Sequence, residues 1–220
     1  MGTITRNAAN NFTTGGVILP AAINDASVAS LTELENVAAG GALTLISEQT
    51  ASGSTSISFT SGIDSTYPIY KFEFINIHAG TSDSRLLLKG STNGGSSYGI
   101  IKTTSAFYGL HSESDVYTEV SYGASSDLAQ ETGGQRIIVT GMGSNADDNA
   151  CGEMFLFNPS STTFVKHFFI RTIQNDKDPN ATDSFISGYF NTTSAINAIQ
   201  FSHNLGTVDG TIKLYGIKDS

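Results

Sequence analysis

The sequence predicts an all-β protein, a two-sheet antiparallel β-sandwich of jelly-roll type with an extended N-terminal arm that contains one short helix. Only 14% of the 220 residues are charged, whereas about a quarter are Ser or Thr and 23 are Gly. This composition suits strands and turns better than helices. From residue 41 onward, short apolar stretches recur at near-regular spacing between Gly-, Asn- and Ser-rich turns. A closed barrel is the competing architecture for this pattern.

The first 40 residues differ from the rest, and we expect them to form a docking arm, with residues 41–220 forming the sandwich domain. Apolar residues recur every third position from Val28 to Val37, and the pair Gly40-Gly41 follows, which predicts one short amphipathic helix. A helix of this length is marginal alone and needs a surface to pack against. We therefore expect the apolar residues of the arm to dock on a partner: Ile4, Phe12, Val17, Ile18, Leu19, Leu31 and Leu34.

The strands follow one another with short polar breaks between them. The clearest lies between Tyr67 and His78, where aromatic residues alternate with charged or aliphatic ones. The expected strands in chain order are 43–45, 56–60, 67–78, 85–89, 98–104, 116–122, 135–140, 153–157, 164–173, 185–190, 198–203 and 211–217. We expect the last two to form a hairpin that turns between Asn204 and Gly210.

Charge and composition argue against several classes of partner. The formal net charge is −9 and the 11 Lys and Arg residues are scattered, so the sequence predicts binding neither to nucleic acid nor to anionic membranes. No apolar run of 18 residues occurs, so no transmembrane helix is expected. The single Cys151 cannot form an internal disulfide.

No catalytic motif stands out, and we predict that the chain is not an enzyme and needs no cofactor. The sequence has neither a His-x-x-x-His pair nor a Gly-x-Ser-x-Gly elbow, and Cys151 is expected in a polar loop without an adjacent base. The four histidines lie far apart in the sequence, at His78, His111, His167 and His203.

A calcium loop is one interpretation of the segment that begins at Asn175. Asp176, Asp178 and Asn180 fit the first three ligand positions of such a loop, since alternate residues of a curling loop project oxygens inward. The match then fails, because Ala181 replaces the turn glycine and Ser187 replaces the bidentate glutamate. Asp-Pro-Asn is also an ordinary turn signal, so both interpretations stay open.

Aromatic residues in the middle of the chain suggest a glycan site. Tyr117 and Tyr122, with the neighbouring Phe107 and Tyr108, fall in segments that could form loops at one end of the sandwich. Exposed aromatic rings stack on sugar faces, and nearby Asp and Asn side chains bind hydroxyls. The alternative is that these rings belong to the core, and the chain has no Trp.

The end of the chain resembles the closing strands of tailed-bacteriophage virion proteins, which often finish with Gly-x-Ile-x-Leu-Tyr-Gly-Ile. The strand from Tyr70 to His78, followed by Arg85–Leu88 and a turn at Gly94, is also similar to these proteins. The residues that match the ending are Gly210, Ile212, Leu214, Tyr215, Gly216 and Ile217. The resemblance covers about residues 41–218, does not separate head decoration proteins from tail fibres or adaptors, and carries no functional residues with it.

The resemblance implies a structural component of a tailed phage particle, located in the virion. Its outer β-sandwich would be attached to capsid or tail through the N-terminal arm, its partners would be other virion proteins, and the chain would form a homotrimer. The alternative function is a receptor-binding module that recognises glycan on the host surface, with Tyr117 and Tyr122 as contacts.

Overall fold

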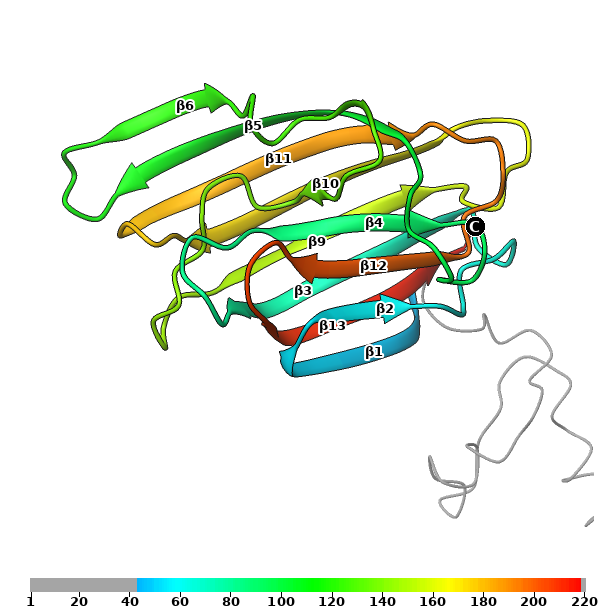
Figure 1. Ribbon diagram of the computed structural model, residues 1–220, viewed down its shortest axis with the longest axis horizontal. Coiled ribbons are helices and arrows are strands. Elements are labelled where there is room, and N and C mark those ends of the chain that lie inside the picture. Colours follow the sequence, from blue (N-terminus) through cyan, green and yellow to red (C-terminus); the bar gives the residue numbers. More distant parts are fainter. Residues whose placement is uncertain (1–42, 219–220) are drawn as a thin grey trace, which may run out of the picture. The chain divides into compact units, whose positions relative to one another are not determined.

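The computed structural model describes residues 43–218, and within them it confirms the all-β sandwich (Figure 1). The expected arm and its helix, residues 1–40, lie outside the described residues and stay a prediction. Among residues 43–218 no helix is long and apolar enough to cross a membrane. The strands are β1 (Leu43–Ser54), β2 (Ser56–Phe59), β3 (Ile69–Ala79), β4 (Leu86–Ser91), β5 (Lys102–Ser112), β6 (Thr118–Tyr122), β7 (Ala129–Glu131), β8 (Gln135–Arg136), β9 (Ala150–Phe157), β10 (Lys166–Asn175), β11 (Asn180–Phe190), β12 (Ala198–His203) and β13 (Val208–Ile217).

The strands form two antiparallel sheets. The larger has the order β1-β13-β3-β9-β10-β11-β5-β6, with β7 also paired to β5, and the smaller has the order β2-β12-β4-β8. From β1 to β5 the chain alternates between the two sheets, as it does in a jelly roll. In Figure 1 the smaller sheet overlies β3, β9 and β13, while β5, β6 and β11 extend past it.

The core that joins the sheets is built from inward-facing aromatic side chains. Along β3, buried residues alternate with half-buried ones, which places Phe72 and Phe74 on the inner face. Phe201 of β12 packs edge-to-face on both rings, at centroid distances of 5.4 and 5.1 Å, and Phe59 of β2 completes the cluster. The inner face of β10 and β11 is instead covered by the segment 137–139, which binds Thr172 and Ser184 through its backbone.

The C-terminal motif from Gly210 to Ile217 lies in β13, which pairs with β1 on one side and β3 on the other. Ile212 and Leu214 point into the core and are fully buried. Gly210 adopts a φ of 117°, a backbone conformation that favours glycine. Gly216 leaves no room for a side chain, because a Cβ there would overlap the Tyr67 ring. Four of the six motif positions, Gly210, Ile212, Leu214 and Gly216, thus have a structural role in the sandwich.

The prediction that the last two strands form a hairpin is wrong. β12 pairs with β2 and β4 in the smaller sheet, and β13 belongs to the larger one, so the turn after His203 crosses between the sheets. Both strands face the same core from opposite sides, and their apolar pattern is therefore the same as in a hairpin. Two smaller expectations also fail: β5 runs on to Ser112 instead of ending at Thr104, and Cys151 lies in β9 rather than in a loop.

Candidate functional site

The hairpin formed by β5 and β6 concentrates exposed apolar surface at one end of the sandwich (Figure 1). Four of the twelve exposed large apolar side chains among the described residues lie within seven positions: Val116, Tyr117, Val120 and Tyr122. Among the strands of residues 43–218, β6 ends the larger sheet and pairs only with β5. Because a groove lies on each face of this hairpin, it is the candidate site.

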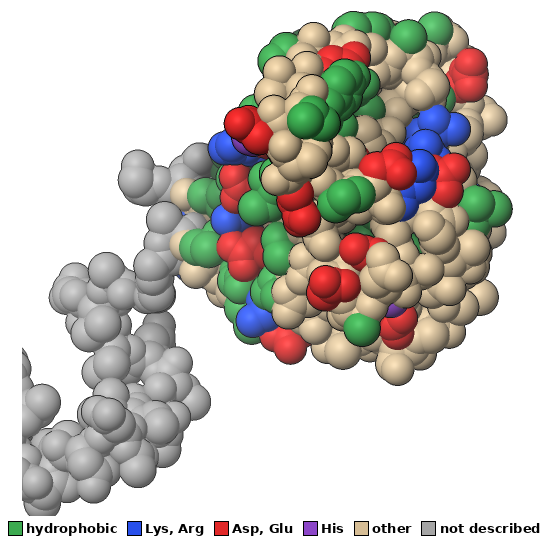
Figure 2. Space-filling view, turned by 90° about the vertical axis from the view of Figure 1, so that its left-hand side faces the viewer, with side chains coloured by type: hydrophobic (Ala, Val, Ile, Leu, Met, Phe, Trp, Pro, Cys, Tyr) green, Lys and Arg blue, Asp and Glu red, His purple; other side chains and the backbone are tan. Residues whose placement is uncertain are grey.

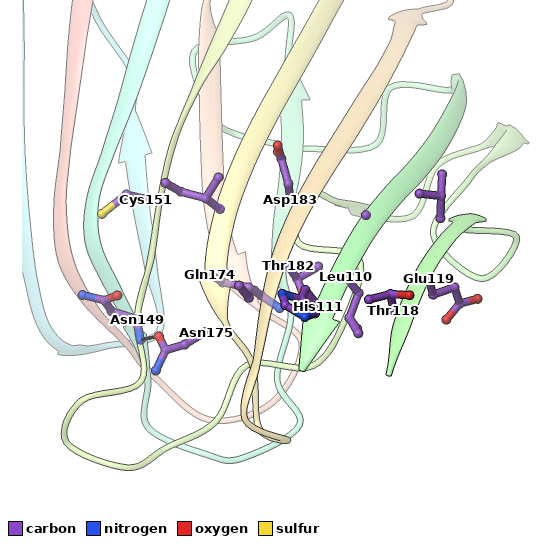
Figure 3. Close-up of a pocket in the computed structure, with 14 residues that line it drawn as sticks. Leu110, His111, Thr118, Glu119, Asn149, Cys151, Gln174, Asn175, Thr182 and Asp183 are labelled. Atoms are coloured by element: carbon purple, nitrogen blue, oxygen red, sulfur yellow. Dashed lines mark hydrogen bonds between the residues drawn. The ribbon is translucent and has the colours of Figure 1, made fainter. Parts of the chain in front are cut away.

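The first groove has a volume of about 710 Å³ and opens on the outer face of the larger sheet (Figure 3). Small residues, Gly109 of β5 and Ala181 of β11, leave its floor open, and the exposed side chains of Val120 and Ile173 stand beside it. Figure 3 shows that β5, β6, β9, β10 and β11 all contribute residues. The other lining residues are Leu110, His111, Thr118, Glu119, Asn149, Cys151, Gln174, Asn175, Thr182 and Asp183.

Several polar groups of this groove already have partners. Asp183 accepts two hydrogen bonds from Arg171, at 3.0 and 2.7 Å, and these bonds raise the pKa of the arginine. His111 Nε2 lies 3.0 Å from a carboxylate oxygen of Asp115. The Cys151 thiol accepts a backbone hydrogen bond from Asn76 at 3.4 Å. The groove therefore offers mainly apolar contact surface, which suits binding better than chemistry.

The outer face beyond the groove carries stacked aromatic pairs and ion pairs. Phe107 stacks on Phe185 across β5 and β11, and Phe155 stacks on Phe169 across β9 and β10, both at centroid distances of 4.9 Å. Lys71 of β3 bridges Glu73 and Glu153. In Figure 2, hydrophobic, acidic and basic side chains are accordingly intermixed along the left side of the described residues. The face has no field of a single sign that would select a strongly charged partner.

The second groove is a polar cleft of about 400 Å³ on the inner side of the same hairpin. Tyr108, Tyr117, Tyr122 and Glu119 line it, together with residues of the loop between β10 and β11. Tyr117 and Tyr122 donate hydrogen bonds to Glu119 and Asp127, respectively, and both tyrosines are about half exposed. Their rings therefore lie outside the core. The remaining lining residues are Arg85, Leu110, Gly123, Ala124, Ser125, Val139, Thr140, Gly141, Asp176, Lys177, Asp178 and Asn180.

The candidate calcium residues meet the candidate glycan residues in this cleft, but their geometry is that of a turn. Asp176 is buried, and its carboxylate accepts hydrogen bonds from the Asp178 backbone, Asn180 and Thr182 at 3.0–3.2 Å. Burial raises the pKa of Asp176, and Asp178 pairs with Lys177 at 2.7 Å. Within residues 43–218 no group of three or more His, Cys, Asp or Glu side chains could hold a metal ion.

One serine–histidine pair resembles a nucleophile and base but is sealed in the core. Ser84 Oγ lies 2.6 Å from His203 Nδ1 and donates to the Leu205 carbonyl at 2.9 Å. Ser84 has no exposed surface and His203 is buried. Burial, assisted by repulsion from His78, lowers the pKa of His203 to about 4. The pair is structural, and its 119-residue separation left no signal in the sequence.

The predicted docking residues Ile4, Phe12, Val17, Ile18, Leu19, Leu31 and Leu34 lie outside the described residues. Sequence reasoning found Tyr117 and Tyr122 but missed the groove residues Gly109, Val120 and Ile173. The alternation of Val120 and Tyr122 with Glu119 and Ser121 could have indicated a strand with one apolar face, although the partner surface on β10 and β11 comes from distant sequence. No family model, curated protein or solved structure matches the chain.

Proposed function

We propose that the chain is a structural component of a tailed phage particle, with its sandwich on the outside and residues 1–40 docking on capsid or tail. The observation that supports this most is the C-terminal motif. Its six virion-like positions lie in β13, the strand between β1 and β3 in the larger sheet. Its partners would be other virion proteins, and the homotrimer implied by the same resemblance belongs to this proposal.

The surface of the sandwich has features that favour contact with other proteins. Exposed apolar side chains gather on the outer face and on the β5–β6 hairpin, including Phe107, Phe169 and Ile173. Gathered apolar surface of this kind usually marks an interaction site. The ionic groups beside it are mostly paired within the chain, so covering them costs less than covering free charges.

Deleting residues 1–40 tests the docking part of the proposal. The hydrophobic core described above lies between Ala51 and Leu214, so the shortened chain should remain folded and soluble. We expect it no longer to be incorporated into particles, whereas the full chain supplied in the same way is incorporated. Incorporation of the shortened chain at full occupancy would show that the arm is not the attachment.

A second candidate function, recognition of host surface glycan, is favoured by the polar cleft. Tyr108, Tyr117 and Glu119 line this cleft, and Tyr122 borders it, although its register partner Phe107 places the Tyr122 ring on the outer face. Arg85 Nε is buried without a hydrogen-bond partner among the described residues. Aromatic rings, hydroxyls and carboxylates are the groups that contact sugars in many binding sites.

A glycan array with two variants tests this second function. We expect the full chain to bind a glycan and Tyr117→Ala to lose that binding, because the half-exposed ring lines the cleft. Phe164→Ala is the matched control, since Phe164 is an exposed aromatic residue that does not line the cleft. Equal binding by both variants, or no binding by the full chain, would rule the cleft out as a glycan site.

A further inference from the structure

Among the described strands, the outer edge of β6 is unpaired and has less protection than the other sheet edges. β1, at the opposite edge of the larger sheet, is interrupted by two register shifts. The edge strands of the smaller sheet, β2 and β8, are only four and two residues long. β6 pairs with β5 in an uninterrupted register, and Thr118–Tyr122 contains no Lys, Arg or Pro, with Glu119 as its one charged residue. Proteins usually blunt edge strands with bulges, charges or proline, because an open edge recruits another strand.

The side chains on this edge are as exposed as its backbone. Val120, in the middle of β6, is 86% exposed, although valine normally seeks a covered strand position. Its register partner on β5 is Gly109, which covers nothing. Tyr122 is opposite Phe107, and both rings are about half exposed on the outer face. A strand laid against β6 would therefore lie directly beside Val120 and Tyr122 and help to cover both.

The sequence of β6 is complementary to itself in the antiparallel direction. When two copies pair about a two-fold axis at Val120, Val120 is opposite Val120 and Thr118 is opposite Tyr122. The same register places Glu119 opposite Ser121, so the strand's one charged residue meets a hydroxyl donor and not a second carboxylate. Tyr117 then lies opposite Gly123, where there is no side chain to obstruct its ring.

We propose that β6 is a homotypic docking edge, which binds β6 of a second copy of this chain in antiparallel register about Val120. The contact is isologous, and it joins the two larger sheets into one continuous sheet. It brings the outer-face groove of one copy next to that of the other, with the two Val120 side chains between them. This inference does not depend on the phage assignment, and a two-fold contact at β6 leaves other surfaces free for a three-fold contact.

Disulfide trapping tests the register directly in the full chain carrying Cys151→Ser, which removes the native thiol. Val120→Cys places two cysteines on the axis, where facing Cα atoms lie about 4.5–5.5 Å apart, within disulfide range. We expect most of this variant to become a covalent dimer on mild oxidation. Val116→Cys is the matched control, since Val116 is 83% exposed but lies outside β6. Its two copies would be about 26 Å apart, eight residues of extended chain, and should not cross-link.

A second variant tests whether the contact forms without a covalent bond. In analytical ultracentrifugation we expect the full chain to associate with rising concentration, and Val120→Lys to shift that association at least tenfold in concentration while its melting temperature is unchanged. Val116→Lys should associate as the unaltered chain does. The proposal is overturned if Val120→Cys gives no covalent dimer, if Val116→Cys cross-links equally well, or if Val120→Lys leaves association unchanged.

Discussion

The buried residue His203 shows how the core tolerates a titratable group by keeping it neutral. Its Nδ1 bonds with Ser84, while its Nε2 is buried without a partner among the described residues. A second proton would have to be held in the same dry environment, next to His78, and burial therefore lowers the pKa of His203 to about 4.

This pKa predicts an acid-dependent loss of stability. Between pH 6.5 and about 4 the unfolded chain binds a proton on His203 that the folded chain does not, so the free energy of unfolding falls as the pH falls through this window. The loss attributable to His203 should reach about 3 kcal/mol at most. Urea unfolding at pH 7 and pH 4.5 measures it. His203→Gln should lose less stability across this interval than the unaltered chain, and an equal loss would contradict the assignment.

Lys102 differs from His203, because its buried ammonium group is charged at neutral pH. It has no exposed surface, donates to the Ile100 carbonyl at 2.8 Å and lies over the Phe190 ring, without a carboxylate partner among the described residues. Burial and the nearby Lys89 lower its pKa to about 8.

Replacing this lysine with an apolar side chain of similar length should stabilise the protein at pH 7. We expect Lys102→Met to raise the free energy of unfolding by about 1–3 kcal/mol, because the cost of burying the charge disappears. The advantage should shrink as the pH rises from 8 to 10.5, where the folded chain has already released the proton and the unfolded chain has not. Urea unfolding at both ends of this range measures it, and destabilisation by Lys102→Met at pH 7 would contradict the account.

At the level of elements, two glycines of the larger sheet differ in the space available for a side chain. Gly216 of β13 lies against the Tyr67 ring, whereas Gly109 of β5 has open space where a Cβ would be. We expect Gly216→Ala to destabilise the protein by about 1–3 kcal/mol through overpacking. Gly109→Ala should be neutral or slightly stabilising, since strand glycines cost conformational entropy. Thermal unfolding compares the two, and equal effects would show that the motif glycine is not a packing requirement.

The strands were predictable from the sequence wherever the pattern of side chains was local. The alternation from Tyr70 to Phe74 indicated β3 and its buried face, and the aromatic and β-branched run ending at Ile173 indicated most of β10. The second half of β5 was missed, because Tyr108, Gly109 and Leu110 face grooves and not the core, so polar and apolar residues do not alternate there.

Pairing and sites were harder to predict, because they depend on residues distant in the sequence. β12 and β13 are consecutive, yet they belong to different sheets, since β12 finds its partners in β2 and β4. The outer-face groove needs Gly109 and Ile173 in one row on either side of Asp183, and only the pairing of β5, β11 and β10 achieves that. The sequence indicated part of the polar cleft, namely its tyrosines and its Asp-Pro-Asn turn, but not that the two lie together.

As a whole molecule, the described residues combine a closed core with an open periphery. The core is one hydrophobic cluster shared by both sheets, so the sandwich has the interior of a stable domain. Its periphery exposes apolar side chains on the outer face and at β6, where a lone soluble domain would carry more charge. The proposed assembly with other proteins would account for the open periphery.

Analysis of purified particles tests this account most directly. If the proposal is right, an antibody raised against the chain should label the outer surface of intact particles of the phage proposed to carry it, and mass spectrometry should find the chain there at a constant copy number per particle. Particles that contain other virion proteins but lack this chain, or that hold it only where antibody cannot reach, would contradict the proposal that it is an external structural component.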